Sequence, residues 1–286
     1  MLTLLFDGIA YGMLLFVLAV GLAVTLGLMN FVNLAHGAFA MAGGYATVLL
    51  MDRAGVPFLA SLPLVFLITA ALGGVLERLL YRPMYSKPHL DQVLFSIGLV
   101  FMAVAGVDYA LGSQQQFVKL PQYFQGRFEI GDVGIGKYRL FIVVLCAVLT
   151  VALQLVLSRT RFGSRLRAAV DDPRVASGLG INVNRVFLLT FAVGSGLAGL
   201  GGALGAEVLG LDPSFPLKFM VYFLIVVAVG GTSSITGPLA AALLLGIADV
   251  MGKYYAPKLG AFIVYTLMIV ILLWRPQGLF ARRGAA

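Results

Sequence analysis

Residues 131–137 have the spacing of a loop that binds nucleotide phosphates. The segment reads Gly-Asp-Val-Gly-Ile-Gly-Lys, and such a loop needs a strand before it, a helix after it and a Ser or Thr that binds magnesium. Here Tyr138 follows Lys137, and the segment lies just before a long apolar run. The sequence therefore predicts that ATP does not bind at this loop.

Other residue types that carry chemistry are too sparse for a catalytic or metal site. The single cysteine, Cys146, excludes an intrachain disulfide and a cysteine-based metal cluster. His36 and His89 stand far apart in unrelated contexts, and no triad of Ser, His and Asp stands out. We expect a chain that catalyses no reaction and holds no cofactor of its own.

Two polar interruptions of apolar sequence are candidates for a solute pathway. They are residues 27–45 and residues 230–238. Amides and hydroxyls cost free energy in hydrocarbon unless they are hydrogen-bonded. Such residues more often cap helix ends, and alternatively they line a polar cavity. The pathway candidates are Asn30, Asn33, His36, Thr232, Ser233 and Thr236.

Several acids stand near the ends of apolar runs. Asp108, Glu207 and Asp249, at predicted outer ends, could attract a cationic group such as a solute ammonium, but acids in such positions are more often hydrated interfacial groups. Glu77 beside Arg78, at a predicted inner end, is interpreted as an ion pair at a helix end.

The basic segment 160–181 begins with an amphipathic pattern. Phe162, Leu166, Ala169 and Val170 recur at helical spacing, and arginines occupy other positions between them. This pattern suits a helix that lies on the inner membrane surface.

A second, shorter helix is expected to follow in the same segment. Asp172 before Pro173 is typical of a helix N-cap and first residue, and Gly178 or Gly180 is typical of a helix end. The sequence therefore predicts a second, short helix on the cytoplasmic side.

Val175 and Leu179 are expected to share one face of this helix, with Ala176 nearby. They would form a small apolar surface held away from the bilayer, which fits a groove on a partner. The alternative is an ordinary positively charged loop with incidental helicity.

The elements that carry these residues must lie in a membrane. The 286 residues are 60% apolar and 11% charged, whereas a soluble domain has about 45–50% and about 25%. The mean hydropathy of +1.00 exceeds what one globular core can hide. The net charge of +8 comes largely from arginines in short loops, which orient membrane proteins, so no nucleic-acid partner is expected. Glycines at 8 and 12, spaced as in small-xxx-small motifs, are expected to pack helices together.

Polar residues divide the chain into about eight to nine candidate transmembrane helices, since one crossing needs about 20 apolar residues. Three candidates, 37–51, 217–231 and 237–251, are short and are expected to be broken or re-entrant. The candidates are residues 8–28, 37–51, 57–80, 91–111, 140–157, 186–210, 217–231, 237–251 and 259–274.

Basic residues in short loops predict the orientation. Arginine-bearing groups follow the third candidate, separate the fifth from the sixth and close the chain, so these groups are assigned to the cytoplasm. Nine crossings would then place the N-terminus outside and the C-terminus in the cytoplasm. The expected organisation is one transmembrane permease domain, 1–286, with a periplasmic loop at 112–139 and a cytoplasmic coupling loop at 158–185.

Four segments together resemble the LivH-type permease subunit of branched-chain amino-acid ABC importers, and the resemblance runs along nearly the whole chain. These segments are 27–45, 160–186, 230–238 and 274–280. The most specific patterns, in combination, are Asn-x-x-Asn-Leu-Ala-His-Gly-Ala-Phe-Ala-Met-Ala-Gly-Gly-Tyr and Arg-Ala-Ala-Val-Asp-Asp-Pro-Arg-Val-Ala-Ser-Gly-Leu-Gly-Ile.

The resemblance implies an importer of the bacterial inner (plasma) membrane. This chain would pair with a LivM-type permease subunit or with a second copy of itself. Two cytoplasmic ATPase subunits would hold ATP and Mg, and a periplasmic substrate-binding protein would deliver the solute. Relatives are often richer in glycine at Thr232 and Ser233, and similar permeases serve other amino acids, amides, urea and small carboxylates.

The resemblance also implies that the stretch from Asp171 to Ile181 is a coupling helix and its flanks, which meet an ATPase. Arg167 stands where the Glu-Ala-Ala pattern of ABC permeases has its glutamate, so no individual ATPase contact is carried over. The coupling candidates are Arg167, Asp171, Asp172, Pro173, Val175, Ala176, Leu179 and Gly180.

The expected function is passive translocation, with helices that alternate between outward-facing and inward-facing states as the ATPases close. The competing hypothesis is a self-contained, ion-coupled secondary transporter or channel. That class usually needs a buried, paired acid within the membrane, whereas the acids here lie mostly near span ends. An intramembrane enzyme is disfavoured because no nucleophile and base can be recognised.

Overall fold

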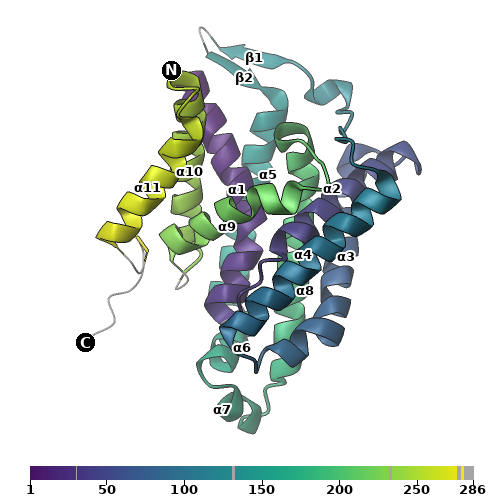
Figure 1. Ribbon diagram of the computed structural model, residues 1–286, viewed down its shortest axis with the longest axis vertical. Helices are drawn as coiled ribbons and strands as arrows, with labels where there is room; N and C mark the ends of the chain where they lie inside the picture. The colour runs from purple at the N-terminus through teal and green to yellow at the C-terminus, as the bar shows by residue number, and fades with distance from the viewer. Residues whose placement is uncertain (30, 131–132, 232–233, 276–277, 280–286) are drawn as a thin grey trace.

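The computed structural model describes residues 1–29, 31–130, 133–231, 234–275 and 278–279, and they are mainly helical (Figure 1). The α-helices are α1 (Leu2–Met29), α2 (His36–Asp52), α3 (Phe58–Leu76), α4 (His89–Leu111), α5 (Lys137–Arg159), α6 (Arg161–Asp171), α7 (Pro173–Gly178), α8 (Val183–Leu209), α9 (Phe215–Gly230), α10 (Thr236–Tyr255) and α11 (Gly260–Trp274). Helix α3 continues into a π-helical turn, η1 (Glu77–Tyr81), and a 3-10 turn, η2 (Arg82–Met84). A further 3-10 turn, η3, spans Gln122–Phe124.

Six helices in the described residues are long and apolar enough to cross a membrane: α1, α3 with its continuation, α4, α5, α8 and α10. Helices α9 and α11 are apolar but shorter. Helix α2, with 17 residues, and α9, with 16, are short as predicted, whereas α10 has 20 residues, so the expectation of a short element at 237–251 is wrong. The chain is a multi-pass membrane protein.

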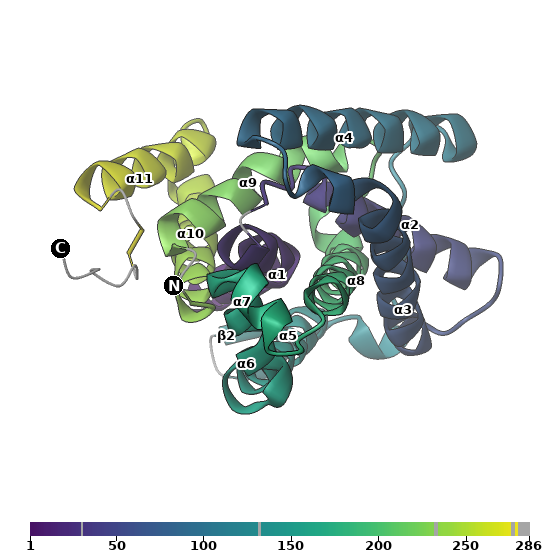
Figure 2. The ribbon, with the colours of Figure 1, turned by 90° about the horizontal axis from the view of Figure 1, so that it is seen from below.

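Helix α1 lies at the centre of the bundle (Figure 2). It contacts α2, α5, α8, α9 and α10, and 83% of its apolar span is buried inside the protein. Helices α4 and α5, with 11% of their spans buried, lie at the periphery and turn large apolar side chains outward. Surfaces of this kind are stable against lipid or another membrane subunit.

The close packing of α1 against α10 depends on glycine. A Cβ added at Gly12 would lie 2.7 Å from the carbonyl oxygen of Ala242, and one at Gly8 would lie 2.7 Å from the Cα of Ile247. Backbones can approach this closely only where no side chain intervenes. The predicted packing role of the glycines at 8 and 12 is confirmed.

A β-hairpin in the loop before α5 departs from the expectation of an all-α chain. Strand β1 (Arg127–Ile130) pairs with β2 (Val133–Gly136) in antiparallel register, with Phe128 opposite Ile135. Residues 133–136 therefore belong to a strand of this hairpin, which is not the strand, loop and helix of a phosphate-binding site.

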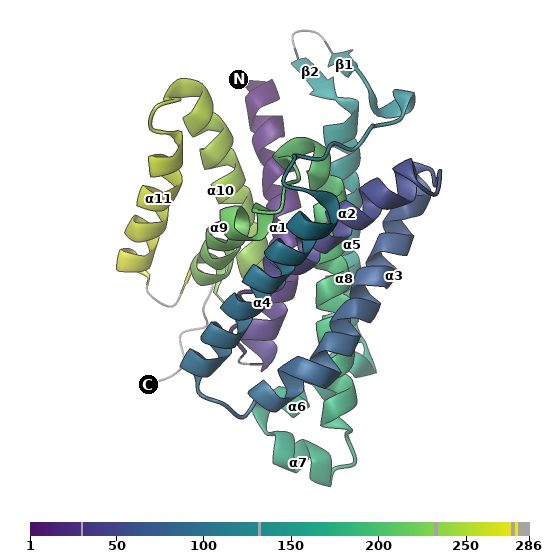
Figure 3. The same ribbon diagram turned by 45° about the vertical axis from the view of Figure 1, so that its right-hand side comes forward.

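The two ends of the bundle differ in character. The N-terminus and the hairpin lie at one end, which we call the hairpin end (Figures 1 and 3). Helices α6 and α7 lie at the opposite end, which we call the α7 end. The predicted outer loop 112–139 and the predicted inner loop 158–185 thus lie at opposite ends of the protein.

Candidate functional site

The polar residues between α1 and α2 join helices to one another. The Tyr81 hydroxyl on η1 donates a hydrogen bond to Asn33 Oδ1 at 3.1 Å, and the His36 ring donates through Nε2 to the carbonyl of Leu18 on α1 at 2.9 Å. Asn33 and His36 are both buried. Helix α2 has Ala35 at its N-cap and no side-chain cap bond, so neither Asn33 nor His36 caps the start of α2, although capping was the favoured interpretation of such residues. Asn30 lies outside the described residues.

The second polar interruption connects α9 to α10. Thr232 and Ser233 lie outside the described residues. Thr236 is the exposed first residue of α10, and its hydroxyl lies 3.1 Å from Ser234 Oγ. Ser234 and Ile235 line a cavity of about 180 Å³ that α5 and α6 also line. The interruption therefore lies beside α6.

The described part of the C-terminal segment 274–280 contacts this same interruption. The backbone N–H of Leu279 donates to the carbonyl of Val229 at the end of α9, at 2.8 Å. A Cβ at Gly278 would lie 2.8 Å from the backbone nitrogen of Gly231. Two motifs that are about 40 residues apart in the sequence are thus in contact.

The short helix α7 begins where the sequence predicts. Asp172 Oδ1 accepts hydrogen bonds from the backbone N–H groups of Arg174, at 2.8 Å, and Val175, at 3.0 Å, and Pro173 occupies the first turn. Gly180, with φ of +83°, follows the helix in the left-handed conformation that favours glycine. The predicted start and end signals of α7 are confirmed.

The exposed surface of α7 differs in one residue from the prediction. Val175 and Leu179 are 58% and 75% exposed, as expected for a docking surface, but Ala176 is only 2% exposed. Ala176 thus faces the protein. Asp171 ends α6 and is exposed.

Helix α6 packs against protein where the sequence predicts contact with lipid. Leu166 and Ala169 are buried in a cluster with Val186 of α8, and Leu157 of α5 packs against this cluster. Arg167 donates from Nη1 to the carbonyl of Leu157 at 2.6 Å, which satisfies an otherwise unpaired carbonyl near the end of α5. The amphipathic pattern was read correctly as a helix, but its apolar face covers α5 and α8.

Glu77 pairs with a different arginine from the one predicted. It is fully buried, Arg82 Nη2 lies 3.5 Å from its Oε2, and the Tyr85 hydroxyl donates to its Oε1 at 3.2 Å. Burial and the neighbouring Glu77 carboxylate raise the pKa of Tyr85. The π-helical turn η1 explains the error, because it shifts the spacing at which side chains meet.

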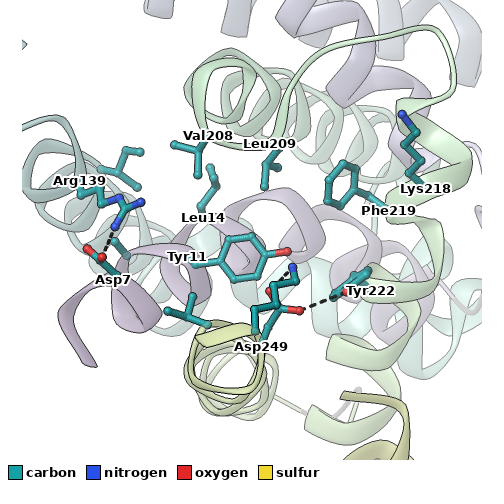
Figure 4. A pocket seen from close by; sticks show the side chains of 14 residues that line it. Asp7, Tyr11, Leu14, Arg139, Val208, Leu209, Lys218, Phe219, Tyr222 and Asp249 are labelled. Atoms are coloured by element: carbon teal, nitrogen blue, oxygen red, sulfur yellow. Dashed lines mark hydrogen bonds and ion pairs between the residues drawn. The ribbon is translucent and has the colours of Figure 1, made fainter. Parts of the chain in front are cut away.

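A cavity of about 450 Å³ opens at the hairpin end between α1, α5, α8, α9 and α10 (Figure 4). Asp249 on α10 is 2% exposed and accepts hydrogen bonds from Lys253 Nζ at 2.6 Å and from the Tyr222 hydroxyl at 3.3 Å. An ion pair between Arg139 and Asp7 lies on the opposite side of the cavity from Asp249, and the Tyr11 ring lies between this ion pair and Asp249 (Figure 4).

The outcome for the three acids at predicted outer ends is mixed. Asp108 and Glu207 are exposed, as expected of hydrated interfacial groups, whereas Asp249 is buried. Sequence reasoning missed the cavity around Asp249. The available signal was Lys253, one helical turn after Asp249, which is the spacing of an intrahelical ion pair.

The family described as "Branched-chain amino acid transport system / permease component" matches residues 4–272. The chain belongs to this permease family. The chain is 28% identical to the high-affinity branched-chain amino acid transport system permease protein BraD of Pseudomonas aeruginosa, over 97% of this chain and 95% of BraD. It is 27% identical to LivH of Escherichia coli K12, over 97% of this chain and 94% of LivH, and 27% identical to LivM of the same strain, over 93% and 68%. No solved structure matches the chain.

Membership of the permease family, and not the placement of the acids, favours an importer subunit over a secondary transporter. The sequence argument against a secondary transporter was that the acids lie mostly near span ends. Glu77 and Asp249 do lie near the ends of their helices, but both are buried and paired. The position of the acids therefore does not by itself distinguish an importer subunit from a secondary transporter. The permease family and the named relatives carry the assignment to branched-chain amino acid transport.

Proposed function

We propose that this chain is the permease subunit of an ATP-driven ABC importer that moves branched-chain amino acids across the bacterial inner membrane. The whole chain forms one permease domain, with the loop 112–139 in the periplasm and both the loop 158–185 and the C-terminus in the cytoplasm. Its partners are a LivM-type permease or a second copy of itself, two ATPase subunits that hold ATP and Mg, and a periplasmic substrate-binding protein. The match of the permease family over residues 4–272 supports this proposal.

The observation that carries the coupling assignment is the apolar surface of α7. Val175 on α7 and Leu179 directly after it are exposed. Helix α7 lies at the end of the bundle opposite the hairpin (Figure 3). Exposed apolar side chains on a short helix outside the bilayer mark a docking surface for another protein. The ATPase is the partner that requires a contact of this kind.

The packing of α6 supplies a route from this surface to the bundle. Helix α7 contacts α6, and α6 contacts α1, α5 and α8. Helix α6 also lines a cavity together with Ser234 and Ile235, which directly precede α10. Displacement of α7 by a closing ATPase dimer would thus reach the interruption between α9 and α10.

The test is co-purification of the ATPase subunits with a Val175→Asp/Leu179→Asp variant of the tagged permease. We expect the ATPases to be lost while membrane insertion is retained, because buried charges oppose docking. Ser177→Asp is the matched control: it adds charge to an exposed position of α7 without removing apolar surface. Unchanged recovery of ATPase with the double variant would refute the coupling assignment.

An ion-coupled secondary transporter is the second candidate, and the burial of Glu77 and Asp249 favours it. Uptake of leucine into proteoliposomes that contain this chain alone, with a proton or sodium gradient imposed, separates the two candidates. We expect no uptake until the partner subunits and ATP are supplied. Robust gradient-driven uptake by the chain alone would establish the second candidate instead.

A further inference from the structure

We propose that the cavity at the hairpin end binds the zwitterion of an α-amino acid with a branched aliphatic side chain. Asp249 would bind the ammonium group, Lys253 the carboxylate, and the apolar wall the side chain. This inference rests on the proposed function and deepens it, because it places a solute site within the permease itself.

The charged groups have the arrangement that an α-amino acid requires. The ammonium and carboxylate of an α-amino acid are attached to the same carbon, so a site must offer a negatively charged and a positively charged side chain next to each other. Asp249 and Lys253 lie one helical turn apart and are already in contact, with Lys253 Nζ 2.6 Å from Asp249 Oδ2. The Tyr222 hydroxyl bonds the second carboxylate oxygen, and the Tyr11 hydroxyl points toward the same group (Figure 4).

The two partners differ in exposure, and this difference permits exchange. The Asp249 side chain is 2% exposed and the Lys253 side chain is 55% exposed. A buried carboxylate needs a cation at all times, because an unpaired buried charge is strongly unfavourable. A ligand ammonium can replace Lys253 at Asp249, and the flexible lysine can turn to bind the ligand carboxylate. No charge is left unpaired by this exchange.

The rest of the cavity is complementary to a hydrocarbon side chain. Leu14, Val208, Leu209, Phe219 and Val250 all line it. A volume of about 450 Å³ lies within the usual range of small-molecule sites. The Arg139–Asp7 pair across the cavity is internally neutralised, so it does not compete for the zwitterion.

The position of the site suits a transport step. Helices α9 and α10 supply Tyr222, Asp249 and Lys253, and these helices meet at the interruption that borders α6. A displacement of α6 that alters this junction would change the separation of α9 and α10, and with it the affinity of the cavity.

Protection of an introduced thiol tests occupancy directly. Val250→Cys, on a Cys146→Ser background, places one thiol in the cavity of the assembled transporter. We expect L-leucine to slow maleimide labelling, by about tenfold at about ten times its Kd if occupancy blocks the thiol. 3-Methylbutylamine lacks the carboxylate and 4-methylpentanoate lacks the ammonium, so neither should protect at the same concentration. Absence of protection by leucine, or equal protection by either analogue, would overturn the proposal.

Uptake by the reconstituted transporter separates a binding role of Asp249 from a purely structural one. Asp249→Asn should reduce ATP-dependent leucine uptake at least about tenfold, which corresponds to about 1.4 kcal/mol. The double variant Asp249→Asn/Lys253→Met leaves no unpaired charge. It restores uptake if the pair is only structural, and it stays inactive if the pair binds leucine. Restored uptake would therefore refute the inference.

A buried acid outside the cavity provides the control. Glu77→Gln removes a charge of equal burial at the α7 end, and leucine should protect the thiol at residue 250 as well as it does in the parent. Failure of the proposed function can be distinguished from failure of this inference. If the proposed function is wrong, the parental assembly shows no ATP-dependent uptake, whereas protection of the thiol by leucine still measures binding in the cavity.

Discussion

The hydrogen bond between Tyr81 and Asn33 provides a sharp test of how this bundle is held together. Tyr81→Phe removes the hydroxyl that donates to Asn33 Oδ1 at 3.1 Å and keeps the ring, so the aromatic contacts of Tyr81 with Phe31, Phe95 and Phe191 persist. The two partners are 0% and 1% exposed, so water cannot replace the lost donor. The substitution therefore isolates one buried hydrogen bond.

The expected cost follows from burial. Interhelical hydrogen bonds in membrane proteins contribute about 0.6 kcal/mol on average and up to about 1.7 kcal/mol, whereas an orphaned buried acceptor costs about 1–3 kcal/mol. Because both partners are fully buried, we expect a loss of about 1–2 kcal/mol in the free energy of unfolding. That corresponds to about a 5-fold to 30-fold change in the unfolding equilibrium.

Reversible unfolding in mixed micelles with increasing denaturing detergent measures this change. Tyr45→Phe is the matched control, because the Tyr45 hydroxyl is buried and has no hydrogen-bond partner in the part of the chain that the structure describes. Its removal should be neutral or stabilising. The reasoning is refuted if Tyr81→Phe destabilises the protein no more than Tyr45→Phe does.

Three further predictions concern packing, capping and pH. Gly12→Ala should destabilise the protein in the same assay, because the added Cβ would lie 2.7 Å from a carbonyl oxygen of α10. Gly74→Ala is the control and should be tolerated, since the nearest neighbours of its Cβ lie at 3.7 Å. Equal destabilisation by the two variants would contradict this prediction. Asp172→Ala should lower the stability of α7 by about 1 kcal/mol through loss of its N-cap, and it should speed proteolysis at α7. Asp172→Asn should retain the cap. Equal rates of cleavage in the two variants would count against the capping role of Asp172. Burial raises the pKa of Asp212, but hydrogen bonds from Lys218 and Ser214 outweigh burial and hold this pKa below its usual value. Asp212 therefore stabilises the folded protein above the pKa that it has in the unfolded chain, and this stabilisation is lost as the pH falls through its pKa in the folded protein. Asp212→Asn should reduce the acid sensitivity of unfolding, and an unchanged pH profile would exclude the contribution of Asp212.

Local signals in the sequence were sufficient for much of the secondary structure. Composition alone required a membrane protein, and the long apolar runs located the helices that can span it. The start of α7 was predictable because Asp172 caps backbone groups two and three residues ahead, within a single turn. The β-hairpin in the loop before α5 was missed, because each of its strands has only four residues, too few for a clear alternating pattern.

The partners of the buried polar groups were decided only by the tertiary structure. His36 bonds to Leu18, Asn33 to Tyr81, and Asp249 to Tyr222, and none of these pairs is set by spacing within one helix. The position of each helix was likewise invisible in the sequence: α1 and α5 are both strongly apolar, yet 83% of the span in α1 and 11% of that in α5 are buried in protein. Lipid is as apolar as a protein core, so the hydrophobic pattern that places a helix in the membrane does not say which neighbour covers it. Close backbone approach at glycine and interhelical hydrogen bonds make that choice, and both exist only once the helices have packed.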